Sequence, residues 1–282
     1  MMIFEHEIPT GSRLYFGKSA KSKRLIETIS SRFLEEKGFE EIITPNFSYS
    51  GHQSIDDDKS LITLSDKVNN SLALRADSTL DVVRIISKRL GRATIHKKWF
   101  YIQPVFTYPA NETYQIGVEW VGHHCISEII NLNCDLLHKL EINTLVQIAN
   151  INIPMIISKK YNIDIDLFRN SEIGALFALN FDWLTKLISI RTSGELENIL
   201  EILPLCLQKE CEKLIRIANN IEYINVNISP IYYSAMKYYD DIYYLIIKDN
   251  LTIAKGGGYK SNGINSLGFA VYTDNLLKVI EG

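Results

Sequence analysis

Residues 99–121, WFYIQPVFTYPANETYQIGVEWV, decide the fold of this chain. Two runs rich in aromatic and β-branched residues, Trp99–Phe106 and Tyr114–Val121, lie on either side of the segment 109–112. Runs of this composition favour strands, and a short loop between them lets the second strand return beside the first. The stretch therefore predicts an antiparallel pair of strands.

Helical patterns precede this pair. Over residues 18–37 apolar side chains recur at the spacing of one helix face, and Gly38 supplies the left-handed residue that often ends a helix. Phe39–Thr44 then predicts a strand. A second helix is expected to begin near Asp77 or Ser78, and the spacing of Ser78 from Asp81 fits a capping box.

Strand patterns return toward the C-terminus. Tyr243–Ile247 and Leu251–Ala254 predict a hairpin across 249–250, where Asp and Asn tolerate positive φ. Ser266–Tyr272 predicts a further strand, and Asp274 is expected to cap a short final helix. Together these patterns predict an α+β fold, with a mostly antiparallel sheet flanked by helices.

The segment from about 132 to 220 has a different pattern. Short helical periodicities dominate it, and few strand signals occur in it beyond 155–157. Strand signals resume at Tyr223, so a helical insertion between two halves of one sheet explains the segment better than a separate domain. We therefore expect a single domain over residues 1–282 that carries this insertion.

The composition fits a protein with one large core. Hydrophobic residues make up 46% of the 282 residues, which is enough to bury such a core. The 30 Lys and Arg residues nearly balance the 33 Asp and Glu residues, and the formal net charge is -3. Without a cationic field over the whole protein, nucleic acid and anionic lipid are not expected as partners.

The cysteines and the N-terminus bear on the compartment. The four cysteines form no CxxC pair and no dense framework, which fits a reducing cytoplasm better than secretion. Residues 1–11 lack the basic and apolar regions of a signal peptide, and no apolar run reaches bilayer-spanning length. We expect a cytoplasmic protein. We expect no metal site, because the run 123–125, His-His-Cys, has no second spaced ligand pair.

Five motifs together resemble the catalytic core of histidyl-tRNA synthetase, a class II aminoacyl-tRNA synthetase. They are LRADST at 74–79, PVFT at 104–107, YQIGVE at 114–119, GGGY at 256–259 and GFAV at 268–271. The resemblance covers most of the chain and implies that enzyme's sheet without its C-terminal anticodon-binding domain. The segment from Gly11 to Pro45 resembles the family's first motif, which implies a homodimer. The alternative is an amphipathic helix that packs only against the core of its own chain.

The resemblance also implies an amino-acid site. Asp77, Thr79, Gln115 and Glu119 match positions that contact histidine in that family. A carboxylate and a hydroxyl at the start of a helix can bind an ammonium group, and they can equally cap the helix. Gln115 and Glu119 lie four residues apart on a strand and therefore on one face. The alternative for Glu119 is a solvent-facing or internally paired carboxylate.

Tyrosines and an arginine extend the comparison. Tyr238 and Tyr239 match the paired tyrosines of the family's histidine-specific segment, with tyrosine packing as the alternative. Arg75 is either a structural ion-pair partner or a remnant of substrate binding. The glycines at 256–258 lack the Gly-Lys-Ser/Thr ending of a phosphate loop, so we expect them to admit a ligand or another backbone.

The arginines that surround ATP in the family are missing. The resemblance places these arginines at the positions that Thr107, Ser234 and Asn275 occupy here. Adenylation concentrates negative charge at the α-phosphate, so losing all three cations would slow it by many powers of ten. We therefore expect no catalytic residue, no cofactor and no adenylation.

A synthetase-like chain with these losses resembles the regulatory subunits of ATP phosphoribosyltransferase, which act in histidine biosynthesis. The resemblance implies a noncatalytic chain that binds and activates a short-form catalytic subunit within a hetero-oligomer. It also implies allosteric feedback by histidine. Two alternatives stay open. One is an ATP-dependent amino-acid-activating or tRNA-modifying enzyme that recruits Arg75 or Lys255, and the other is an interaction module with an empty pocket.

Overall fold

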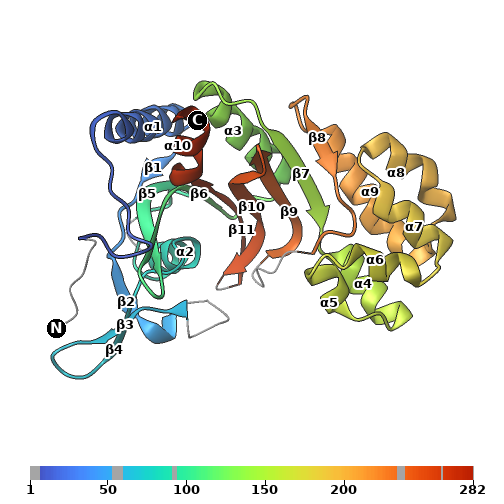
Figure 1. Cartoon of the computed structure of the whole chain (residues 1–282), viewed down its shortest axis with the longest axis horizontal. Helices are drawn as coiled ribbons and strands as arrows, with labels where there is room; N and C mark the ends of the chain where they lie inside the picture. Colours follow the sequence, from blue (N-terminus) through green and yellow to red (C-terminus); the bar gives the residue numbers. More distant parts are fainter. Residues whose placement is uncertain (1–6, 53–59, 91–93, 234–238, 262, 282) are drawn as a thin grey trace. The chain divides into compact units, whose positions relative to one another are not determined.

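The computed structural model describes residues 7–52, 60–90, 94–233, 239–261 and 263–281 (Figure 1). The chain forms two compact units, one of residues 1–121 with 270–282 and the other of residues 122–269. Strand β11 (Ile264–Tyr272) begins in the second unit and ends in the first.

The main sheet of the first unit contains three strands that lie wholly within it. They are β1 (Glu40–Glu41), β5 (Lys98–Thr107) and β6 (Asn111–Val121). β1 pairs parallel with β5, and β5 pairs antiparallel with β6. The antiparallel pair predicted between residues 99 and 121 is therefore confirmed. Beside it, β2 (Phe47–Tyr49), β4 (Ser71–Leu74) and β3 (Thr63–Ser65) form a small antiparallel sheet in that order.

Helices α1 (Gly17–Glu36), α2 (Thr79–Lys88) and α10 (Thr273–Glu281) contact the main strands of this unit. The amphipathic pattern of α2 explains its position, because Val82 and Ile86 are buried against Trp99, Tyr101 and Val121. After α1 the chain turns at Gly38, whose φ of 79° confirms the predicted left-handed residue.

The second unit has strands in the order β11-β10-β9-β7-β8. Their bounds are β7 (Leu145–Asn150), β8 (Val226–Ile228), β9 (Tyr239–Lys248) and β10 (Leu251–Ser261). Strand β9 pairs antiparallel with β10 and β7, while β7 pairs parallel with β8. The predicted β9–β10 hairpin is confirmed, and Asp249 and Asn250 at its turn have φ of 48° and 63°.

Helices make up much of the second unit. Helix α3 (Ile126–Lys139) precedes β7, and a group of short helices follows it, shown from green to orange in Figure 1. The group comprises α4 (Asn152–Tyr161), α5 (Ile165–Arg169), α6 (Ile173–Ala178), α7 (Asp182–Ser189), α8 (Ser193–Ile199), the short 3-10 helix η4 (Leu200–Ile202) and α9 (Leu205–Asn219). Helix α9 contacts β7 and β8.

Two details of this region differ from the prediction. The strand signal at 155–157 is wrong, because these residues belong to α4. Strand β7 lies within the range expected to be helical. Both segments are short apolar runs, which periodicity alone does not assign to helix or strand.

The predicted helix caps also differ. Ser78 precedes α2 without a capping hydrogen bond, because its hydroxyl accepts from Gln103 Nε2 at 3.2 Å. Asp81, the other half of the expected capping box, instead pairs with Arg84 at 2.8 Å. Asp274 lies inside the first turn of α10, where its carboxylate accepts from the backbone N–H of Tyr114 at 3.2 Å. No helix in the described ranges has both the length and the apolar character needed to cross a membrane.

Candidate functional site

Tyr101 occupies the centre of the candidate site. It pairs with Gly117 across β5 and β6, and its ring lies where a Gly117 side chain would be. A Cβ added to Gly117 would stand 2.0 Å from Tyr101 Cζ. The glycine is therefore required to admit the ring, which is fully buried.

Three of the predicted histidine-binding residues lie close to this ring. The Tyr101 hydroxyl is 3.5 Å from Thr79 Oγ1. Burial raises the pKa of Tyr101 well above its usual range, and the nearby carboxylates of Glu119 and Asp77 raise it further. Glu119 itself is 0% exposed, so the solvent-facing alternative for it is excluded. The geometry brings two carboxylates and a hydroxyl near one buried phenol, and of the two carboxylates Glu119 is buried and Asp77 is half-buried.

Asp77 also shapes the start of α2. Its Oδ1 accepts a hydrogen bond from the backbone N–H of Thr79 at 2.8 Å, so the capping role considered for this residue is real. Its charge also reaches Tyr272, whose pKa is raised by burial first and by Asp77 second. One Asp77 oxygen thus accepts a hydrogen bond at the start of α2, and the charge of the same carboxylate raises the pKa of Tyr101 and Tyr272.

The remaining predicted contacts are less defined. Gln115 is half-buried on β6, opposite Gln103 of β5. Tyr238 lies outside the described residues. Tyr239 begins β9 and pairs with Tyr259 of β10, but its side chain also lies outside the description.

Arg75 has a structural role. It is fully buried and donates to backbone carbonyl oxygens of Thr44, Pro45 and Pro104 at 2.7–3.0 Å. Further bonds run to Thr44 Oγ1 and to Asn46 Oδ1, both at 3.0 Å. Burial lowers the pKa of Arg75. Arg75 therefore has a structural role through hydrogen bonds to neutral oxygens and not, among the described residues, through the ion pair considered for it.

Neutral groups stand at the positions where the resemblance to histidyl-tRNA synthetase leads us to expect arginines. Thr107 ends β5, and Asn275 lies in the first turn of α10. Ser234 lies outside the described residues. Lys255, the other cation considered as a replacement, lies on β10, and burial lowers its pKa.

The first glycine of the run 256–258 makes room for a side chain. A Cβ on Gly256 would stand 2.5 Å from the ring of Tyr244, whose hydroxyl accepts from Asn133 Nδ2 at 3.2 Å. At Gly256 the expectation of room for a ligand or another backbone is therefore wrong, because a tyrosine ring fills that space. No group of three or more His, Cys, Asp or Glu side chains suited to a metal occurs in the described part of the chain.

The sequence motifs did not reveal Tyr101 or Tyr272. The available signal was Gly117, an isolated glycine within a strand pattern, which often marks a close approach by another group. Which group approaches depends on the strand partner, and that follows from the fold.

The fold and this buried site define a protein of the histidyl-tRNA synthetase class. A family model described as Histidyl-tRNA synthetase matches residues 16–276. A structure titled as an ATP phosphoribosyltransferase regulatory subunit/histidyl-tRNA synthetase from Bacillus halodurans superposes with a TM-score of 0.86 at 21% identity. That match covers 100% of this chain and 85% of the other, and it supports the mixed, largely antiparallel fold.

Relatives with higher sequence identity show which family within this class the chain belongs to. The ATP phosphoribosyltransferase regulatory subunit of Wolinella succinogenes is 41% identical, over 99% of this chain and 98% of the relative. The protein of the same name from Helicobacter hepaticus is 37% identical, over 99% of each chain. The chain belongs to the family of ATP phosphoribosyltransferase regulatory subunits, within the histidyl-tRNA synthetase-like proteins.

Proposed function

We propose that this chain binds and activates a short-form ATP phosphoribosyltransferase catalytic subunit in histidine biosynthesis and conveys feedback by histidine. It does so without catalysing adenylation. Family membership supports the regulatory role. The observation that supports histidine sensing is the group around the buried Tyr101, which comprises Glu119, Asp77 and Thr79.

The chemistry of this group fits an amino acid with a cationic part. A buried carboxylate is costly unless a cation or hydrogen-bond donors compensate it. The ammonium group or imidazolium ring of histidine would supply that charge to Glu119 or Asp77, and the hydroxyls of Thr79 and Tyr101 add hydrogen-bonding positions. Feedback then requires that histidine bind one state of the complex more tightly than another.

The lack of adenylation follows from the neutral groups at the ATP positions. Thr107 and Asn275 offer no positive charge to a developing phosphate anion, and preorganised charge is usually the largest catalytic contribution. Arg75 is held by carbonyl oxygens of its own unit. This arrangement argues against the alternative in which Arg75 replaces the lost cations.

A homodimer is part of the proposal. Its support is a set of apolar side chains before, within and after α1 that are exposed in the single chain, including Phe16 (74%), Leu25 (60%) and Ile43 (79%). Exposed apolar side chains in one region commonly mark a contact surface. Sedimentation equilibrium of the chain alone tests this, and a monomer across the micromolar range contradicts it.

The main experiment mixes this chain with the cognate short-form catalytic subunit. Formation of phosphoribosyl-ATP should rise as the chain is added, and histidine should suppress the rise. Glu119→Gln removes the buried charge with little change in shape, so histidine inhibition should weaken at least tenfold while activation persists. Glu36→Gln, at an exposed position of the same unit, is the control and should leave both responses unchanged.

Other outcomes separate the alternatives. Failure to bind or activate the catalytic subunit rules out the regulatory role. Activation without any histidine response supports the interaction module instead. ATP–pyrophosphate exchange with any amino acid, catalysed by the chain alone, supports the amino-acid-activating enzyme.

A further inference from the structure

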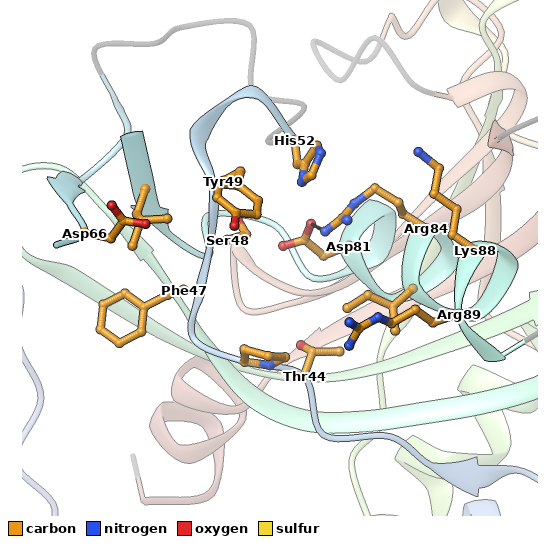
Figure 2. A pocket seen from close by; sticks show the side chains of 13 residues that line it. Thr44, Phe47, Ser48, Tyr49, His52, Asp66, Asp81, Arg84, Lys88 and Arg89 are labelled. Carbon is orange, nitrogen blue, oxygen red and sulfur yellow. Dashed lines mark hydrogen bonds and ion pairs between the residues drawn. The ribbon is translucent and has the colours of Figure 1, made fainter. Parts of the chain in front are cut away.

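The first unit contains a hollow of about 620 Å³ that the site around Tyr101 does not use. It lies between the segment 44–52 and one face of α2 (Figure 2). Asp66 and Leu72, from the small sheet and its turn, complete the lining. The volume lies within the range of pockets that bind small molecules.

Helix α2 presents a charged face to this hollow. Its lining residues are 81, 84, 85, 88 and 89, a spacing that places them on one side of a helix. Four of these five are charged, and three are Arg or Lys. The other side of α2 packs into the core through Val82 and Ile86. The cations therefore lie along a concavity, in contrast to the cations of an ordinary solvated helix face.

The two carboxylates of the hollow are already engaged. Asp81 pairs with Arg84 at 2.8 Å. Asp66 accepts from Asn70 Nδ2 at 2.7 Å and from the backbone N–H groups of Asn70 and Val68, each at 2.9 Å. The hydrogen bonds from Asn70 hold the pKa of Asp66 below its usual range. The hydrogen bonds of Asp66 thus stabilise its own turn, and its carboxylate forms no ion pair with the cations of α2 in the described residues.

Lys88 and Arg89 remain available to a ligand, whereas Arg84 already pairs with Asp81. Lys88 and Arg89 are exposed and form no ion pair with any residue in the described ranges. Arg84 Nε is buried, and within those ranges it has no hydrogen-bond partner. Figure 2 shows the guanidinium groups of Arg84 and Arg89 extending from α2 toward the segment 44–52. Arginine forks of this kind match the oxygens of a phosphate.

The opposite wall supplies flat and apolar surfaces. Tyr49 and His52 meet edge to face, with ring centroids 5.6 Å apart, and Phe47 lies on the same segment. Pro45 and Ile85 add apolar surface to the lining of the hollow. A planar ring can stack on such side chains while a phosphate attached to it faces the cations.

We propose that this hollow binds an aromatic phosphate, a small molecule that joins a flat ring to one or more phosphates, as nucleotides do. The site is separate from the residues proposed to hold histidine, so either one can fail without the other. The regulatory chain would then bind a second ligand in addition to histidine.

The test measures binding to the full chain by isothermal titration calorimetry. The probes are adenosine 5′-monophosphate and uridine 5′-monophosphate. Adenosine and uridine test the ring-bearing half of each probe, and inorganic phosphate tests the phosphate half. At least one monophosphate should bind saturably, once per chain, and at least tenfold more tightly than its nucleoside or inorganic phosphate.

Variants locate the site. The double change Lys88→Gln with Arg89→Gln should weaken the monophosphate at least tenfold. The control, Lys97→Gln with Lys139→Gln, removes the same charge from exposed positions outside the hollow and should have no effect. Tyr49→Ala should weaken the monophosphate but not inorganic phosphate. Circular dichroism checks that each variant is folded.

Three results overturn the proposal. One is no saturable binding of either monophosphate up to millimolar concentration. Another is equal binding by the Lys88 and Arg89 double variant and the control. The third concerns the oligomeric state: the double variant sediments as a monomer, whereas the unmodified chain sediments as a dimer and binds no ligand. That result would mean that a second copy of the chain covers the hollow.

Discussion

Arg75 donates through both Nε and Nη2 to the carbonyl oxygen of Pro104, at 3.0 and 2.7 Å. Its Nη1 donates to carbonyl oxygens of Thr44 and Pro45, each at 3.0 Å. One side chain therefore ties β5 to the segment that leads from β1 into β2. The planar guanidinium fork makes this possible, because it presents several donors in fixed directions.

Replacing Arg75 with Lys should destabilise the protein although the charge is kept. An ammonium group cannot reach all of these oxygens, and leaving buried acceptors unsatisfied should cost about 2–4 kcal/mol in the free energy of unfolding. Urea denaturation measures this. Arg24→Lys, at a side chain that is 81% exposed, is the matched control and should change the stability by less than about 0.5 kcal/mol. Equal stability of the two variants contradicts a structural role.

Gly117→Ala should displace Tyr101. The added Cβ would stand 2.0 Å from the ring, so the ring or the strand must move, at a cost of about 1–3 kcal/mol. Histidine binding should also weaken, because Tyr101 orders the group that contains Thr79 and Glu119. Calorimetry with histidine and urea denaturation measure the two effects.

Gly174→Ala is the control for this change. Gly174 lies in α6, and nothing lies within 4 Å of a Cβ placed there. Alanine should therefore be neutral or stabilise the protein by up to about 1 kcal/mol. If the two alanine variants behave alike, the contact between Gly117 and Tyr101 does not limit the site.

The four thiols should divide into two classes. Cys134 and Cys211 are buried, and burial raises the pKa of each to about 12. Cys125 and Cys206 are exposed. Because the thiolate is the reactive form, two thiols should react rapidly with Ellman's reagent in the native protein and all four in denaturant. Rapid native reaction of Cys134, located by peptide mapping, contradicts this packing.

The contact between Tyr15 and Asp274 should make stability depend on alkaline pH. Burial, then the hydrogen bond to Asp274, raises the pKa of Tyr15 above its usual 10. A folded pKa above the unfolded one gives stability that is complete below about pH 10 and is lost as pH rises further, because the unfolded chain ionises first.

Tyr15→Phe should therefore cost about 1 kcal/mol near pH 8, for the lost hydrogen bond, and less as pH rises above about 10. Urea denaturation at several pH values gives the difference between the two proteins. Tyr108→Phe, at a side chain that is 64% exposed, is the control and should follow the unmodified protein. A cost for Tyr15→Phe that grows with pH would reverse the predicted sign.

Local signals in the sequence predicted the β5–β6 pair and the β9–β10 hairpin. Both are continuous in the chain, and each carries its own information in strand composition and turn residues. Local signals failed at β7 and α4, where a short apolar run fits either structure until its neighbours are known. The capping box failed because Gln103, distant in sequence, occupies the hydroxyl of Ser78.

The sequence by itself predicted the motif positions Asp77, Thr79 and Glu119, and it places Thr107 and Asn275 where the resemblance leads us to expect arginines. Only the tertiary structure decided that these three residues share one buried tyrosine, that Arg75 serves the backbone, and that α2 lines a cationic hollow. The physical reason is that a motif fixes which groups are present. Their partners depend on strand register and helix packing, which join residues far apart in the chain.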